Sequence, residues 1–387
     1  MERQYMNEKL WNKKYIFLIV VNTFSSFSFY MITTILSSHL VELGSSLSKA
    51  GIIVGLFSIT ALAVRPVTGY ISDNWNKKNI LIVSTVINGI AIIGYVSTSS
   101  FVVITLLRIM HGLFFALLST AIVSIASEQM PKTRISEGIG YLGLGLIIAS
   151  AVGPGVGTWI MQQYGMKYSF FAAALFSFLA TLFMLIFEYK VRIERKSFKI
   201  TFSDIVCTEA LRNAFVGGIY SFGNGAIASF IVLYALEKGI AGVSIYFTVS
   251  ALFMLAVRPL IGKIADQIYI GYIVYAGTAL AAVSMIILAN ADSLPVIILS
   301  GALRAVGQGA AQPVLQAECV KKAGIERSGV AASTFYLGGD IGQGLGPIIG
   351  GVVAGMFGYA SVFYVCVVLL VIAMIVFYCG EKIENEK

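Results

Sequence analysis

The chain has 387 residues, of which 58% are hydrophobic and 12% are charged, and it carries a formal net charge of +8. Its mean hydropathy of +0.86 is too high for a soluble domain that buries its apolar side chains in one core. The composition therefore excludes an ordinary soluble protein and indicates an all-α polytopic membrane protein.

Apolar runs that recur along the chain set the number of membrane crossings. A run of about 20 apolar residues crosses the ~30 Å hydrocarbon layer as a helix. We predict twelve such helices, over residues 15–37, 49–71, 79–97, 101–126, 138–161, 169–187, 213–236, 243–265, 270–290, 295–317, 329–354 and 359–380. The first run is too long for a signal-peptide core and no small-residue cleavage site follows it, so we expect it to be retained.

A long polar stretch separates the sixth and seventh runs. It covers residues 188–212 and contains Lys190, Arg192, Arg195, Lys196, Lys199 and Arg212. We therefore expect a six-helix bundle over residues 1–188, a basic cytoplasmic linker over 189–210, and a second six-helix bundle over 211–387. A solvated linker near anionic lipid explains these charges, and a partner-binding segment is the alternative.

The distribution of positive charge predicts the orientation. Lysines and arginines gather at the two termini, in the linker and in every second connection, whereas the remaining connections hold Lys49, Lys167 and Lys238. The positive-inside rule then places both termini in the cytoplasm, at a plasma or inner membrane. The net charge is thus a topology signal, and we expect no nucleic acid as a partner.

One sequence pattern occurs twice, half a chain apart. RPVTGYISD runs from Arg65 to Asp73, and RPLIGKIAD runs from Arg258 to Asp266. GPGVG at 153–157 returns as GPIIGG at 346–351 with the same displacement of 193 residues, and Arg134 maps onto Arg327. A shared displacement indicates that a six-helix unit has been duplicated.

These motifs resemble those of the major facilitator superfamily over essentially the whole chain. Gly69 to Asp73, followed by Lys77 and Lys78, resembles the signature between helices two and three. LLRIMHG around Arg108 resembles the helix-four signature, with His111 in the place of a glutamine. The glycine and proline motifs of helices five and eleven resemble the signature of antiporter-type exporters. The resemblance implies two bundles that rock to open a central cavity to each side in turn.

A conformational latch at the cytoplasmic rim is the first site we predict. A carboxylate at Asp73 can accept hydrogen bonds from helix N-termini and pair with basic residues, and such contacts bias a two-state equilibrium. A loop cap without a switching role is the alternative. The latch residues are Gly69, Asp73, Lys77, Lys78, Glu128, Arg134 and Asp266. The first copy of the repeated pattern is followed by Lys77 and Lys78, whereas no such basic tail follows the second copy. We therefore expect Asp73→Asn to impair cycling more than Asp266→Asn. Arg65 and Arg258 are expected to be structural or to support the latch, not to bind substrate, with head groups that extend to the membrane interface.

Small residues in helices five and eleven form a second group. Glycines at four-residue spacing allow helices to pack closely, and proline permits bending, so we interpret the group as a hinge and seal between the halves. Ordinary helix packing is the alternative. The group comprises Gly153, Pro154, Gly157, Gly346, Pro347 and Gly350.

Charges inside the membrane form the third group. Asp340 lies ~18 Å into helix eleven, near the depth of Arg304. A carboxylate there needs a cation or a shifted pKa, so Asp340 is a candidate for proton coupling or for binding a cationic group, and a static bridge to Arg304 is the alternative. Arg108 and His111 are further coupling or substrate candidates, although a lone histidine is also explained by a plain hydrogen bond. The candidate cavity residues are Asn22, Phe27, Tyr30, Tyr220, Asn224 and Tyr336.

Nothing in the sequence resembles a catalytic, nucleotide-binding or metal site, so we expect neither an enzyme nor a cofactor. Four cysteines, at 207, 319, 366 and 379, show no metal spacing and are expected to be structural thiols. The leading hypothesis is a monomeric secondary transporter that exports small organic molecules, drug-like or metabolite, in exchange for protons. A proton-coupled uptake symporter is the alternative within this class, while a membrane enzyme or a channel is disfavoured.

Overall fold

The computed structural model describes residues 9–189 and 201–385, and within these ranges the chain is helical and forms no strand. Eleven helical segments of the described residues are long and apolar enough to cross a membrane. The eleventh predicted helix, α14 (Ser328–Phe357), is not among these segments; it has 30 residues and contains several glycines together with Asp340 and Gln343. The all-α fold predicted from composition is confirmed.

The helix boundaries follow the apolar runs closely. The first half contains α2 (Lys13–Glu42), α3 (Leu47–Asn74), α4 (Lys77–Ser97), α5 (Phe101–Ser127), α6 (Ile135–Leu142), α7 (Leu144–Tyr164) and α8 (Met166–Ile186). The second half contains α10 (Leu211–Glu237), α11 (Ile245–Ala265), α12 (Ile270–Ala289), α13 (Leu294–Ala323), α14 and α15 (Tyr359–Asn385). Side-chain caps mark the N-termini of several helices. Before α2, for example, the Asn12 side chain accepts a hydrogen bond from the Tyr15 N–H at 2.9 Å.

One predicted helix is divided. The run predicted over 138–161 consists of α6 and α7, which meet at Gly143, and the short 3₁₀ turn η1 (Lys132–Arg134) precedes them. Glycines at 138, 140, 143 and 145 lower the helix propensity of this stretch, which explains the break. Three other short elements also arise in polar segments: α9 (Phe202–Ile205), η2 (Thr208–Ala210) and η3 (Ile325–Arg327). Half of the predicted basic linker, residues 190–200, lies outside the described residues.

The chain divides into two compact units. Unit 1 comprises Met1–Pro131, Leu142–Val206 and Ile325–Ser333, and unit 2 comprises Lys132–Tyr141, Cys207–Gly324 and Thr334–Lys387. Each unit thus includes a short segment that belongs, in sequence, to the other half of the chain. The boundaries of the two bundles at the linker stay a prediction.

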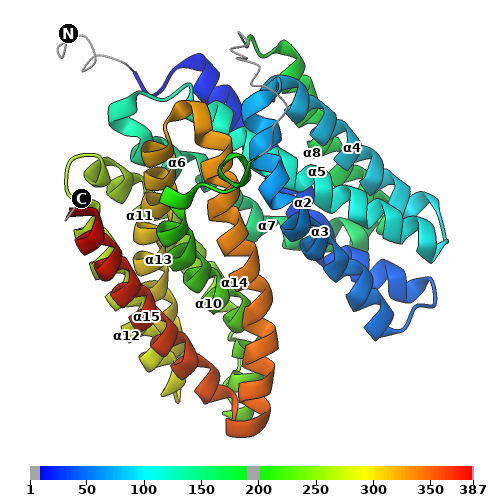
Figure 1. Cartoon of the computed structure of the whole chain (residues 1–387). Helices are drawn as coiled ribbons and strands as arrows, with labels where there is room; N and C mark the ends of the chain where they lie inside the picture. The colour runs from blue at the N-terminus through cyan, green and yellow to red at the C-terminus, as the bar shows by residue number, and fades with distance from the viewer. Residues whose placement is uncertain (1–8, 190–200, 386–387) are drawn as a thin grey trace. The chain divides into compact units, whose positions relative to one another are not determined.

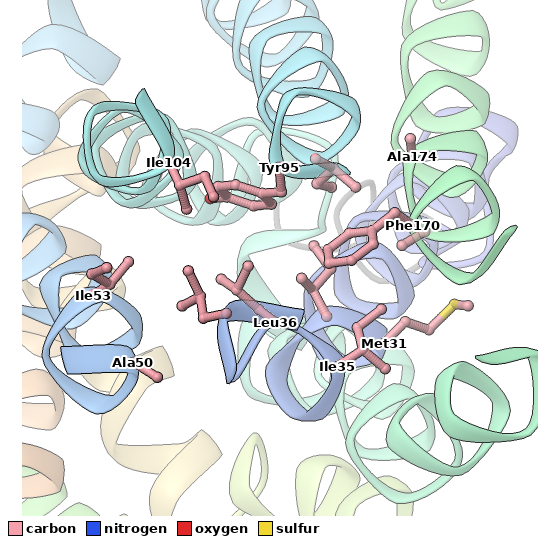
Figure 2. Close-up of a cluster of buried hydrophobic side chains, with 13 residues drawn as sticks. Met31, Ile35, Leu36, Ala50, Ile53, Tyr95, Ile104, Phe170 and Ala174 are labelled. Carbon is pink, nitrogen blue, oxygen red and sulfur yellow. The ribbon is translucent and has the colours of Figure 1, made fainter. Parts of the chain in front are cut away.

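The core of unit 1 is apolar and joins five helices. Helix α2 packs against α7 and α8, α3 packs against α5, and α4 packs against both α5 and α8. Figure 2 shows an apolar cluster at the end of these helices where α2 leads into α3 and α4 into α5; it includes Leu36 of α2, Ile53 of α3, Tyr95 of α4, Ile104 of α5 and Phe170 of α8. Burial of these side chains holds the helices of unit 1 together.

Unit 2 is built from pairs of helices that lie side by side. Helix α13 packs against α10, α11 and α12, and α15 packs against α10 and α12 (Figure 1). A smaller apolar cluster of Ala265, Ile273, Ala310 and Val314 joins α11, α12 and α13. This packing fixes α13, which carries Arg304, against its neighbours.

Candidate functional site

Asp73, at the end of α3, binds the beginning of α14. Its carboxylate accepts the backbone N–H of Gly329 at 2.7 Å and of Val330 at 2.9 Å, both in the first turn of that helix. A negative charge is favourable there because the first N–H groups of a helix have no partner within it. Gly69 makes the approach possible, since a Cβ at this position would lie 2.7 Å from Val330 Cα.

Asp266 makes the same arrangement in unit 2. Its carboxylate accepts the N–H of Ser136 at 3.1 Å and of Glu137 at 2.9 Å, in the first turn of α6. Gly262 permits this contact, because a Cβ there would lie 2.9 Å from Glu137 Cα. The displacement of 193 residues relates both the acceptors and the donors, so the duplication preserves a complete structural device.

The second copy lacks the basic residues that follow the first, yet Asp266 has a basic partner. Lys321 of α13 donates to the Asp266 carboxylate at 2.8 Å and to the Ser136 hydroxyl at 2.8 Å. This lysine comes from another helix and not from the residues that follow Asp266 in the chain. This removes the reason for ranking Asp73 above Asp266.

The other latch residues have specific partners. Lys77 pairs with Glu128 at 2.5 Å, and the Tyr189 hydroxyl donates to the second oxygen of that carboxylate at 2.9 Å. Lys78 instead donates to the carbonyls of Leu185 and Phe187 at 3.0 and 2.7 Å, and so caps the end of α8.

Arg134 belongs to unit 2, where its Nε donates to Glu137 at 2.7 Å.

A polar cavity of about 560 Å³ in unit 1 lies beside the first copy of the motif. Its lining includes Lys14, Asp73, Lys77, Glu128 and Arg327.

The two arginines that open the repeated motif are buried. Arg65 is 3% exposed and Arg258 is 9% exposed, so the expectation that their head groups reach the membrane interface is wrong. Arg65 donates from Nη1 to the Ser119 hydroxyl at 2.6 Å and to the Ala116 carbonyl at 3.2 Å, both in α5. These acceptors, which sequence reasoning missed, satisfy the guanidinium inside unit 1.

Arg108 and His111 lie together on α5. The Arg108 guanidinium donates from Nε and Nη2 to the Val54 carbonyl at 3.2 and 3.1 Å and lies 4.6 Å from the centre of the Phe57 ring. The carbonyl and the ring face both stabilise its positive charge. His111 is buried, and its Nδ1 lies 3.0 Å from the Tyr95 hydroxyl, which is the plain hydrogen bond named as the alternative.

Arg304 occupies the related place in unit 2. It is 8% exposed, and its Nη2 donates to Asn224 Oδ1 at 2.6 Å and to the Tyr220 carbonyl at 3.5 Å. The Tyr220 hydroxyl lies 2.9 Å from that of Thr278. Two predicted cavity residues therefore contact Arg304 directly.

Asp340 lies near the middle of α14 and is partly buried, as is Tyr336 one turn before it. The described hydrogen bonds of Arg304 lead to α10, so they do not form the bridge to Asp340 that was considered as an alternative. A role of Asp340 in proton coupling stays a prediction.

The predicted cavity residues of the first half contact neighbours within unit 1. The Asn22 amide donates to the Leu142 carbonyl at 2.8 Å, and the Phe27 ring stacks on Phe176 with 5.4 Å between centres. Tyr30 packs against Phe29 and against Gly153. A contribution of these three to a substrate cavity stays a prediction.

The glycines of α7 and α14 bring each of these helices close to a partner in its own unit. A Cβ at Gly153 would lie 3.0 Å from Tyr30 Cβ, and one at Gly157 would lie 2.7 Å from the Met31 carbonyl oxygen. In α14, Gly346 faces Phe222 and Ala226 of α10, whereas Gly350 faces the Phe230 ring. Pro154 and Pro347 lie inside these helices. The contacts are those of close packing, and a hinge role stays a prediction.

No cluster of metal ligands occurs among the described residues. The cysteines in this part of the chain are all free thiols; Cys207, Cys319 and Cys366 are buried, whereas Cys379 is exposed.

Sequence reasoning also missed Gln308 and Gln312 on α13, whose side chains form a hydrogen bond to each other at 2.8 Å. Gln308 lies four residues after Arg304 and Gln312 four residues after Gln308, and this helical spacing could have pointed to them in the sequence.

Comparisons with known proteins agree with this architecture. The model of the Major Facilitator Superfamily matches residues 18–345 and 293–386. The multi-drug resistance efflux pump PmrA of Streptococcus pneumoniae is 26% identical over 332 residues, which cover 81% of this chain and 82% of that protein. The staphylopine export protein of Staphylococcus aureus is 23% identical over 385 residues, covering 93% of this chain and 94% of that protein.

The crystal structure of the human organic anion transporter MFSD10 has a similar fold. Its TM-score is 0.81 at 14% sequence identity, with 94% of this chain and 98% of that chain covered. Helical spans, duplicated motifs and a family match along the chain identify a multi-pass membrane transporter of small molecules and not an enzyme. The chain belongs to the Major Facilitator Superfamily.

Proposed function

We propose that the protein exports small organic molecules across the cytoplasmic membrane in exchange for protons, by alternating access. The observation that carries this proposal is the mirrored pair of caps, Asp73 on α14 and Asp266 on α6. In each cap, the carboxylate and the helix it binds come from opposite halves of the sequence. Contacts of this kind can be made in one state of a transport cycle and broken in the other.

Export is favoured over uptake by two features. The names of the similar PmrA and staphylopine proteins describe them as an efflux pump and an export protein. The sequence also carries the antiporter-type glycine motif twice, at 153–157 and 346–351. A proton-coupled uptake symporter is the alternative, and the direction of the gradient-driven flux distinguishes the two.

Asp340 is our candidate for the coupling residue. It lies well inside α14 and is partly buried, and an ionisable side chain at such depth is costly unless it serves transport or is paired. Protonation on one side of the membrane and release on the other would connect its charge to the transport cycle.

We further propose that the protein works as a monomer with both termini in the cytoplasm. Lys132 and Lys238 are both exposed and lie in connections that the charge distribution assigns to opposite sides. In a background without native cysteines, Lys132→Cys should react with an impermeant maleimide in inverted vesicles, and Lys238→Cys in intact cells. The reverse pattern would overturn the orientation.

Transport in inverted vesicles with an imposed pH gradient tests the main proposal. Carboxyfluorescein and ethidium serve as anionic and cationic probes, and an acid interior should drive accumulation of a transported probe. Asp340→Asn should abolish the gradient-driven part while exchange without a gradient persists. Glu237→Gln, at the exposed end of α10, is the matched control and should behave like the parent. Undiminished gradient-driven transport by Asp340→Asn would remove this residue from the coupling mechanism.

A further inference from the structure

Helix α13 carries a stripe of polar side chains at four-residue spacing. From Ser300 onward, every fourth residue is polar: Ser300, Arg304, Gln308, Gln312 and Gln316. Residues four apart are neighbours on a helix, but each step of four turns about 40° further round the axis, so these side chains follow a line that winds round α13. Polar side chains are rare within membrane helices and face the interior of a bundle or water. We call these five residues the α13 stripe.

Arg304 keeps its positive charge without a counter-ion in unit 2. The Asn224 Oδ1 and the Tyr220 carbonyl that accept from it are both neutral, and the side chain of Tyr246 also lies beside it. Within residues 9–189 and 201–385 it forms no ion pair. A buried charge that is solvated only by neutral oxygens is unfavourable and attracts an anion.

The glutamines next to Arg304 have unused hydrogen-bonding capacity. Gln308 is 2% exposed, and its Nε2 donates to Gln312 Oε1 at 2.8 Å, which leaves its own Oε1 without a partner. Turning the amide round would exchange the two atoms but would still leave one of them unpaired. Gln316 Nε2 is also buried and unpaired. Buried polar atoms of this kind are places where water or a ligand completes the hydrogen bonds.

The duplicated helix shows that the α13 stripe is not required by the fold. In α5, the positions four and eight residues after Arg108 are Gly112 and Ala116. Moreover, the Phe57 ring covers the Arg108 guanidinium, whereas no aromatic face is placed over Arg304 among the described cation–π contacts. The second half therefore carries glutamines where the first half carries glycine and alanine.

We propose that Arg304, together with Asn224, Gln308 and Gln312, binds the carboxylate of a transported organic anion. The guanidinium can hold a carboxylate through two parallel N–H···O bonds, and the amides can donate to its remaining lone pairs. The same positive charge would disfavour an organic cation, so the α13 stripe selects between solutes by charge. This inference names the substrate class and rests on the proposed function as a transporter of small organic molecules.

Reaction of an introduced cysteine measures the local charge without a known substrate. In a background with serine at 207, 319, 366 and 379, Gln312→Cys is treated with two methanethiosulfonates, one carrying a sulfonate and one a trimethylammonium group. We expect the anionic reagent to react several-fold faster, and we expect the added Arg304→Gln to abolish that preference. Leu299→Cys, on an exposed apolar part of α13, should react with neither reagent. Arg108→Gln should leave the preference of Gln312→Cys unchanged.

Two outcomes of this experiment overturn the proposal. If Gln312→Cys reacts with neither reagent, the α13 stripe is dry packing. If the preference for the anionic reagent survives Arg304→Gln, the arginine is not its source. Neither outcome depends on a proton gradient. If the charge preference is found as expected but a pH gradient drives no transport, only the proposed proton coupling fails, and the anion site stands.

Ligand-induced stabilisation gives a second measurement on the purified protein. Benzoate, benzamide and benzylamine have similar shapes but are anionic, neutral and cationic. Benzoate should raise the Tm of the parent, benzylamine should not, and Arg304→Gln should lose the effect. Gln308→Leu covers the case in which Arg304→Gln fails to fold: removing the unpaired amide should raise the Tm without ligand and reduce the shift caused by benzoate. Equal stabilisation by benzylamine, or no stabilisation of the parent by benzoate, contradicts an anion site.

Discussion

The Asp73 carboxylate accepts the backbone N–H of Gly329 at 2.7 Å, across 256 positions of sequence. Asp266 does the same to Ser136. In both cases the acceptor is a side chain, but the donors are backbone groups in the first turn of a helix. Both copies use an aspartate and a glycine on the acceptor side and a helix start on the donor side. The donor residues differ: Gly329 leaves room for the Asp73 carboxylate, since a Cβ there would lie 2.5 Å from Asp73 Oδ1, whereas serine stands at the related position 136.

The first prediction concerns the two aspartates of the repeated motif. Asp73→Asn and Asp266→Asn should each lower the transport rate, because loss of a charge-assisted hydrogen bond costs about 1.5–3 kcal/mol. Such a change alters a two-state equilibrium by about 10- to 150-fold. Asp266→Asn should be at least as harmful as Asp73→Asn because it also breaks the pair with Lys321. Initial rates in proteoliposomes measure both effects.

Asp292→Asn provides a control for the loss of an aspartate charge. Asp292 pairs with Lys238 at 3.2 Å, but its side chain is 83% exposed, and pairs of this kind contribute little. This variant should transport at the parental rate. A parental rate for both Asp73→Asn and Asp266→Asn would show that the caps do not control the cycle.

The second prediction uses two glycines of α3. Gly69→Ala should impair transport and lower the yield of folded protein, because the added Cβ meets Val330 Cα and Ser333 Cβ at 2.7 and 2.8 Å. Gly55→Ala in the same helix meets nothing within 4 Å and should be neutral or slightly stabilising. Thermal unfolding and transport rates compare the two. Similar behaviour of both variants would mean that the close contact at Gly69 is dispensable.

The third prediction applies the same test to α14. Gly346→Ala places a Cβ 2.8 Å from the Ala226 backbone nitrogen and should push α14 away from α10, with a cost of about 1–3 kcal/mol. Gly344→Ala, two residues earlier, meets nothing within 4 Å and should be tolerated. If Gly346→Ala lowers the Tm and the transport rate together, the residue serves packing. A lower rate at an unchanged Tm would support the hinge.

The helices could be predicted closely because membrane thickness imposes a length that hydropathy reveals. The break at Gly143 was missed, since four nearby glycines change local propensity without interrupting the apolar run. That Asp73 accepts hydrogen bonds from a helix N-terminus could be predicted from its placement, but which helix it binds could not, because backbone donors have no sequence signature. Lys321 was missed because the same displacement maps it onto Glu128, a residue of opposite charge.

The last prediction separates His111 from the coupling mechanism. His111 is buried on α5, three residues from Arg108, and its Nδ1 lies 3.0 Å from the Tyr95 hydroxyl. A proton added there would put a second positive charge beside the arginine, in a place where charge is costly. His111→Gln can still hydrogen-bond to Tyr95 and should keep both the Tm and the pH dependence of transport. His111→Leu leaves the hydroxyl unpaired and should cost about 1–3 kcal/mol of stability, also without a change in the pH profile. Asp340→Asn, measured alongside, should flatten that profile. A shifted pH midpoint in His111→Gln would instead make this histidine part of the proton pathway.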